Sequence, residues 1–181
     1  MTLSQLRRFF NAPWLVGISA LLFLVSQATI GSILHPIGAA TLLKVQTTFF
    51  SAQDYLAFFA ELRQQELLQH YANHLVVDAW HPLWYGLFGV SLLAVLMQRL
   101  NLADCNNGLL ALPVLAACCD VIENHIQLVF LTGDTQITNA LVILSTTSSL
   151  IKWVAVLGFL LPSIYWLVQL GLRRVATDHN G

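Results

Sequence analysis

The sequence is poor in charged residues. Only 9% of its 181 residues are Asp, Glu, Lys or Arg, whereas an ordinary soluble domain contains about 25%. Hydrophobic residues make up 57% of the chain. A soluble fold of this length cannot cover its surface with so few charges. The composition therefore excludes an ordinary soluble domain and indicates a protein embedded in a membrane.

An excess of either charge is also missing. Eight Lys and Arg residues stand against nine Asp and Glu residues, which gives a formal net charge of −1. A nucleic-acid partner is not expected, because the chain has no basic field that would attract phosphates.

Cysteine pairs and common enzyme motifs are absent as well. The cysteines are Cys105, Cys118 and Cys119, and no Cys-x-x-Cys pair occurs. Adjacent cysteines have poor geometry for a disulfide, so we interpret all three as small packing residues. The chain has no Gly-x-Ser-x-Gly motif, no phosphate-binding glycine loop and no His-Glu-x-x-His motif, which removes the enzyme classes that these motifs mark.

What the sequence does contain is long apolar segments. About 20 helical residues cross the hydrocarbon layer of a bilayer, and four segments meet this length: residues 13–34, 77–98, 108–131 and 146–172. We therefore predict an all-α fold, an integral membrane four-helix bundle that forms a single membrane domain over residues 1–181. The first segment, with Ser26-Gln27-Ala28, also has features of a cleaved signal peptide. Its apolar character continues to Leu34, which favours an uncleaved anchor.

The basic residues orient the four segments. They flank three of the spans on one side: Arg7, Arg8, Arg99, Arg173 and Arg174. The short turn at Gly133 and Asp134 carries no basic residue. The positive-inside rule then predicts that both termini are cytoplasmic, in the inner membrane if the protein is bacterial.

The external connection, residues 35–75, is predicted to form one or two amphipathic helices on the outer membrane surface. Ser51 and Asp54 have the spacing of a capping box, and apolar residues then recur at helical intervals: Tyr55, Phe58, Phe59 and Leu62. Residues 61–74 are expected to continue into the second span as one helix. The connection is interpreted either as a cap over the end of the bundle or as an entrance for an apolar substrate.

Ionisable residues within the apolar segments are the main functional signal. A charge near the centre of a bilayer costs about 2.5–3.5 kcal/mol, so each one calls for an explanation. Three expected spans carry a polar stripe on one helical face: His74, Asp78, His81 and Tyr85; Asp120, Glu123, Asn124 and Gln127; and Ser145, Ser148, Ser149 and Lys152. Because lipid cannot satisfy polar groups, the stripes should converge inside the bundle, where Asp120 or Glu123 can neutralise Lys152.

These stripes supply the candidate site. We assign acid, base or charge-stabilising roles to the ionisable residues Asp78, Asp120, Glu123 and Lys152, and binding roles to the polar residues His81, Tyr85, Asn124, Ser148 and Ser149. Lys152 can hold an anionic head group or stabilise developing negative charge. Pro82 leaves the carbonyl near Asp78 without its helical partner, which can kink the second span.

Four short stretches resemble a known family. They are a Ser-led helix at Ser51–Leu62, Asp-x-x-x-Pro-Leu-x-Tyr-Gly at Asp78–Gly86, Asp-x-x-Glu-Asn at Asp120–Asn124, and Lys152-Trp153. This pattern is similar to that of small four-span membrane proteins, mostly bacterial, of unassigned function. The resemblance covers about residues 47–170 and implies the four-span topology but no activity. His81 stands where the pattern has an apolar residue.

Three functional classes remain open. The first is an intramembrane enzyme acting on a lipid or isoprenoid-like molecule. The second is a metal site built from His81, Asp78, Asp120 and Glu123, although no cofactor is the primary expectation. The third is a non-catalytic protein that binds a ligand, couples transport to protons, or serves as an accessory subunit of a membrane complex. The expected partners are the lipid bilayer and a lipid-like small molecule.

Overall fold

The computed structural model describes residues 2–133 and 136–178, so Asp134 of the expected external turn lies outside the described residues. Within these ranges the chain forms eight α-helices, one 3-10 helix and no strand, which confirms the all-α prediction. Four helices in these ranges are long and apolar enough to cross a membrane, at Pro13–Leu34, His81–Arg99, Asp104–Thr132 and Asn139–Arg173.

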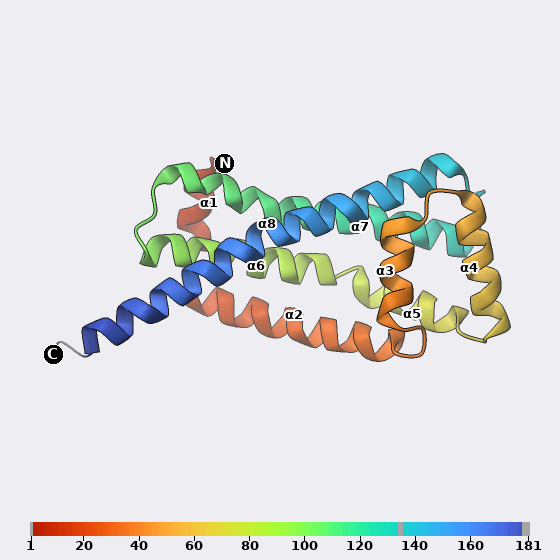
Figure 1. The fold of residues 1–181 in the computed structure, drawn as a ribbon, viewed down its shortest axis with the longest axis horizontal. Helices are drawn as coiled ribbons and strands as arrows, with labels where there is room; N and C mark the ends of the chain where they lie inside the picture. The colour runs from red at the N-terminus through yellow and green to blue at the C-terminus, as the bar shows by residue number, and fades with distance from the viewer. Residues whose placement is uncertain (1, 134–135, 179–181) are drawn as a thin grey trace.

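The long helices share one direction. Helices α2, α6, α7 and α8 run roughly along the long axis, and α3 and α4 lie across one end (Figure 1). The elements in chain order are α1 (Leu3–Phe10), α2 (Pro13–Leu34), α3 (Ala39–Thr48), α4 (Ala52–Gln64), α5 (Leu68–Asp78), α6 (His81–Arg99), η1 (Asp104–Leu110), α7 (Ala111–Thr132) and α8 (Asn139–Asp178). Helix α6 packs against α2, α7 and α8, and α7 packs against α8.

The bounds of the first long helix agree with the first predicted segment, and those of the other three helices differ from the predicted segments. Helix α2 has the predicted bounds, but the segment predicted at 108–131 begins with the 3-10 helix η1. Helix α8 begins at Asn139 rather than at residue 146. The Asn139 side chain accepts a 2.7 Å hydrogen bond from the backbone N–H of Ala52, so this polar first turn is held by α4. Hydropathy alone does not register such a contact.

The prediction of one continuous helix into the second span is wrong. Helix α5 ends at Asp78 and α6 begins at His81. Pro82 has no N–H to donate to the carbonyl of Asp78, four residues earlier. The side-chain amide of Asn124 in α7 donates to this carbonyl instead, at 3.3 Å. The carbonyl that the sequence leaves free is thus bonded by a neighbouring helix.

The external connection forms three helices rather than one or two. The capping box at Ser51 and Asp54 is present, and its hydrogen bonds lower the pKa of the Asp54 carboxyl below its ordinary value. The chain turns sharply after α4, where Glu66 has a left-handed φ of 60°, so residues 61–74 are not one helix. A position on the outer membrane surface stays a prediction.

Helix α4 covers an aromatic cluster at its end of the molecule. Its residues Tyr55, Phe58, Phe59 and Leu62 are buried, as the helical spacing predicted. Tyr55 and Phe130 of α7 meet edge to face with ring centroids 5.1 Å apart. The hydroxyl of Thr146 in α8 also donates to the carbonyl of Phe49, just after α3. These contacts fix α3 and α4 against α7 and α8.

Close packing and a buried arginine hold the other end together. A Cβ at Gly89 of α6 would lie 2.8 Å from the Pro113 ring of α7, so only glycine permits this approach. Arg7 of α1 donates to the carbonyls of Met97, at 2.8 Å, and Leu102, at 3.1 Å. Arg7 therefore satisfies carbonyls at and just beyond the C-terminal end of α6.

The hydrogen bond from Asn124 to the Asp78 carbonyl, which replaces the one that Pro82 cannot make, gives a testable prediction. Asn124→Ala should lower the free energy of unfolding by about 1 kcal/mol, because it leaves a partly buried carbonyl without its hydrogen bond. In a Pro82→Ala background the new N–H can bond to that carbonyl, so the same change should cost much less. Thermal unfolding in detergent, followed by circular dichroism, measures both costs. If Asn124→Ala lowers the free energy of unfolding equally in the wild-type and Pro82→Ala backgrounds, Asn124 does not replace the missing backbone hydrogen bond.

Candidate functional site

A cavity of about 850 Å³ lies between the helices. Its apolar walls come from α2, α3 and most of the lining residues of α8, and its back comes from α5, α6, α7 and Lys152 of α8. The wall residues are mostly apolar and include Phe23, Ile30, Leu34, Leu42, Val45, Val156, Phe159 and Leu160. Residues of α2, α3 and α8 line the cavity, and Figure 1 shows α3 lying across one end of the molecule, next to α8 and α2. The space suits an elongated apolar molecule.

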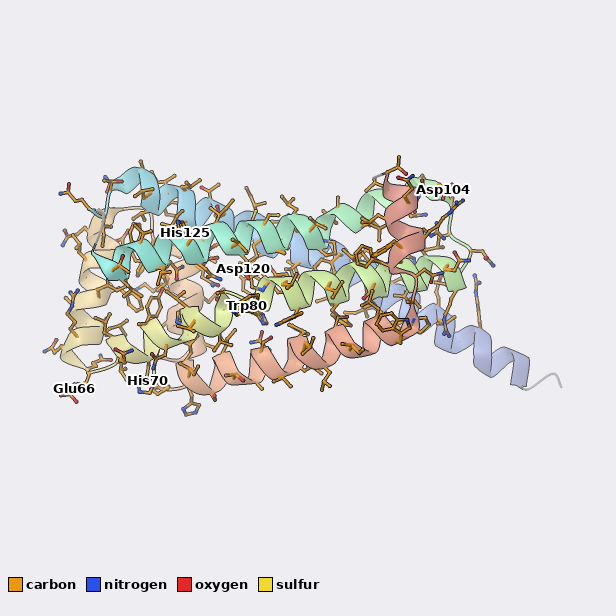
Figure 2. All side chains as sticks on the ribbon, turned by 180° about the vertical axis from the view of Figure 1, so that it is seen from behind. Glu66, His70, Trp80, Asp104, Asp120 and His125 are labelled. Atoms are coloured by element: carbon orange, nitrogen blue, oxygen red, sulfur yellow. The ribbon has the colours of Figure 1, made fainter. Side chains whose placement is uncertain are left out.

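The ionisable side chains gather on the back of this cavity. Five of them, called the polar patch below, line it together: Asp78, His81, Tyr85, Asp120 and Lys152. They come from α5, α6, α7 and α8, so the fold joins residues that are far apart in the sequence. Figure 2 shows Asp120 on α7, close to the break between α5 and α6 where Trp80 lies.

Lys152 forms two buried ion pairs with α7. Its Nζ lies 2.8 Å from Oδ1 of Asp120 and 2.7 Å from Oε2 of Glu123. The three residues are 6%, 4% and 0% exposed, respectively. The expected contact between Lys152 and the α7 carboxylates is therefore present, and it involves both acids. Burial at this level makes each charge dependent on the others.

Glu123 lies behind the polar patch and does not line the cavity. Its Oε1 accepts a 2.9 Å hydrogen bond from Gln127, whose own carbonyl oxygen accepts a 2.7 Å bond from Tyr71. Both carboxylate oxygens of Glu123 are thus bonded, one to Gln127 and the other to Lys152. This saturation suits a counter-ion better than a proton carrier, whereas Asp120 reaches the cavity.

Two histidines make hydrogen bonds through Nδ1. His81 Nδ1 lies 2.8 Å from Ser26 Oγ, whose hydroxyl also lies 2.9 Å from the carbonyl of Phe23, so the serine hydrogen can go to either partner. Nδ1 of His74, another cavity residue, contacts the carbonyl of Tyr71, which can only accept. A neutral His74 then keeps Nε2 as a hydrogen-bond acceptor.

Three buried hydroxyls reach no full hydrogen-bonding geometry within the described residues, although each lies near a polar side chain: Tyr85 near Asp120, Ser145 near Tyr55, and Ser149 near Glu123. Only Tyr85 also lines the cavity. Ser148 and Ser149 are buried on α8 outside the cavity lining, and the Asn124 side chain is bonded to the Asp78 carbonyl. Among the predicted binding residues, the structure therefore brings His81 and Tyr85 to the cavity. All these functional roles stay predictions.

The metal hypothesis gains no support from the geometry. Across residues 2–133 and 136–178 no group of three or more His, Cys, Asp or Glu side chains could hold a metal ion. Lys152 occupies the position between Asp120 and Glu123 that a cation would need. His125 is exposed on the outer side of α7, where Figure 2 labels it.

Sequence reasoning missed the contribution of α2 and α3. Gln27 of α2 and Gln46 of α3 line the cavity, and Ser26 of α2 binds His81. Gln46 also accepts a 3.2 Å hydrogen bond from the indole of Trp153. The adjacent polar pair Ser26 and Gln27 within an apolar segment is the signal that could have identified α2 as part of the site.

The ion pairs give a prediction about folding. Lys152→Ala should destabilise the fold by about 3–5 kcal/mol, because two buried carboxylates lose their cation. Folded yield should fall at neutral pH and recover partly at lower pH, where protonation removes the buried charges. Size-exclusion chromatography of the detergent extract measures the yield.

Two controls make this test specific. Lys44→Ala removes the charge of an exposed lysine and should leave the yield unchanged. The triple variant Lys152→Met, Asp120→Asn, Glu123→Gln removes all three charges and should be milder than Lys152→Ala alone. A neutral Lys152→Ala, or a triple variant as unstable as the single one, would refute the pairing.

Comparisons with protein-family models, with curated proteins and with solved structures found no match. The resemblance to small four-span membrane proteins therefore stays a prediction, and the proposals below rest on the geometry of this chain alone.

Proposed function

We propose that this chain is a multi-pass membrane protein that binds a lipid-like amphiphile in the cavity between α2 and α8. The observation that carries the proposal is that apolar and charged residues line different parts of the cavity surface. Its walls are largely apolar, and the charged residues that line it belong to the polar patch on its back. An apolar chain fits the walls while a polar head group reaches the patch.

The surfaces of the flanking helices support a position in lipid. In the most apolar stretch of α2, only 11% of the residues are buried. The helix exposes five large apolar residues: Trp14, Ile18, Leu21, Leu24 and Val25. Helix α8 also exposes large apolar residues, including Val154, Leu157 and Leu161. Lipid can cover these faces, and an amphiphile can then enter sideways between α2 and α8.

In this proposal the four long helices form the spans of a membrane bundle. Both termini face the cytoplasm of a bacterial inner membrane, as the arginine distribution favours. Asp120, Glu123 and Lys152 then lie inside the bilayer, where their mutual ion pairs make burial tolerable.

Catalysis on the bound head group is a second candidate function. It is favoured by the presence of Asp78, His81 and Asp120 together on the back of the cavity. A carboxylate and a neutral imidazole can exchange protons with a bound molecule, and Lys152 can stabilise negative charge beside Asp120. A purely structural role for the polar residues leaves the adjoining cavity without an explanation.

Filling the cavity tests the binding function. Gly31 of α2 lines the cavity, and a side chain added there would meet open space. Gly31→Phe should therefore occupy the cavity and lower the amount of co-purified amphiphile at least tenfold, as measured by native mass spectrometry and lipid extraction. Gly17→Phe is the matched control, because Gly17 also faces open space on α2 but does not line the cavity. Equal amphiphile content in the two variants would contradict the proposal.

The topology has its own test. Cys105 is exposed between α6 and α7, on the side predicted to be cytoplasmic. In a Cys118→Ala, Cys119→Ala background, an impermeant maleimide added to intact cells should not label Cys105. The same reagent should label Gln69→Cys, which is exposed near the start of α5. Reversed labelling would exclude the proposed orientation.

A further inference from the structure

The polar patch offers a bound molecule mainly acceptors and negative charge. Asp78 and Asp120 both line the cavity, and Glu123 lies directly behind Lys152. Among the residues that the structure describes, Lys152 is the basic partner in the ion pairs of this cluster, and its contacts go to Asp120 and Glu123. Three acids therefore stand against one lysine, so the cluster carries excess negative charge while the acids are ionised.

His74 adds another acceptor. Its Nδ1 is bonded to the carbonyl of Tyr71, which leaves Nε2 of the neutral ring as an acceptor. The ring lines the same cavity as Asp78. A ligand that only accepts hydrogen bonds finds few donors here.

Tyr85 adds an acceptor to the patch. Its side chain lines the cavity, it is 8% exposed, and its hydroxyl lies close to the carboxylate of Asp120. A hydroxyl whose hydrogen points at a carboxylate presents its oxygen to other groups as an acceptor. Tyr85 therefore strengthens the acceptor character of the patch.

We propose that the polar patch binds the protonated amine of a long-chain amine or amino lipid. This inference rests on the proposed binding function and adds the head-group class. An ammonium group brings three donors and one positive charge, so it can bond to the carboxylates of Asp78 and Asp120 while Tyr85 Oη accepts. An anionic head group, which the sequence suggested for Lys152, finds two of the three N–H donors of the lysine already bonded to Asp120 and Glu123, and it would have to approach the carboxylates of Asp78 and Asp120.

A series of amphiphiles with one tail and different heads tests the head-group class. The probes are tetradecylamine, tetradecanol, tetradecyl phosphate and tetradecyltrimethylammonium, titrated into the full chain in nanodiscs of phosphatidylcholine. Tetradecylamine should bind at least tenfold more tightly than tetradecanol, since a charge-assisted hydrogen bond in a buried site is worth that much. Tetradecyl phosphate should bind most weakly. The trimethylammonium compound should bind only slightly more tightly than tetradecanol, because it has no N–H donor.

Two variants and a control show which residues cause the preference for the amine head group. Asp78→Asn should abolish the preference for the amine, and Tyr85→Phe should weaken amine binding several-fold. Glu61→Gln, the same kind of charge removal on an exposed residue of α4, should leave the preference intact. Propylamine, which lacks the tail, should not compete, so the site would distinguish an amphiphile from a free amine.

The outcomes separate this inference from the function on which it rests. Equal binding of all four heads, tighter binding of the phosphate, or an unchanged preference in both Asp78→Asn and Tyr85→Phe would overturn the amine assignment and leave amphiphile binding in place. Failure of all four probes to bind wild-type protein, together with equal amphiphile content in the Gly31→Phe and Gly17→Phe variants, would overturn both.

Discussion

The ion pairs of Lys152 are the interaction on which the rest of the structure depends. An isolated buried ammonium would cost far more than a helical protein of this size can tolerate, so α8 must place Lys152 against α7. Glu123 extends the contact through Gln127 to Tyr71 of α5, and Asp120 extends it to the cavity. One charge balance thereby fixes three helices and sets the back wall of the candidate site.

The break between α5 and α6 connects this network to the cavity. Pro82 ends the hydrogen-bond ladder, and Asn124 of α7 bonds to the freed carbonyl of Asp78. Asn124 follows Glu123 directly, so the same turn of α7 holds Lys152 on one side and the end of α5 on the other. The break is therefore supported by tertiary contacts, which keep Asp78 at the cavity.

Helical periodicity predicted what lies within one helix and could not predict what several helices build together. The stripe containing Asp120 and Glu123 faces Lys152 because a 3.6-residue repeat fixes the facing side. The cavity needs α3 beside α2 and α8, and the position of α3 depends on contacts such as Gln46 with Trp153. In the sequence, Arg7 is only a basic residue that orients the first span. In the structure Arg7 also donates hydrogen bonds to carbonyls near the end of α6.

The buried polar residues of this fold differ in how completely their hydrogen-bonding groups are bonded. Glu123 has both oxygens bonded and is fully buried, as expected for a group whose role is to neutralise Lys152. Tyr85 is nearly as buried, its hydroxyl lies close to Asp120 but meets no group at full hydrogen-bonding geometry within the described residues, and its side chain lines the cavity. In the proposed function, a bound head group completes the hydrogen bonds on this side of the patch, whereas the bonds of Glu123 are already complete.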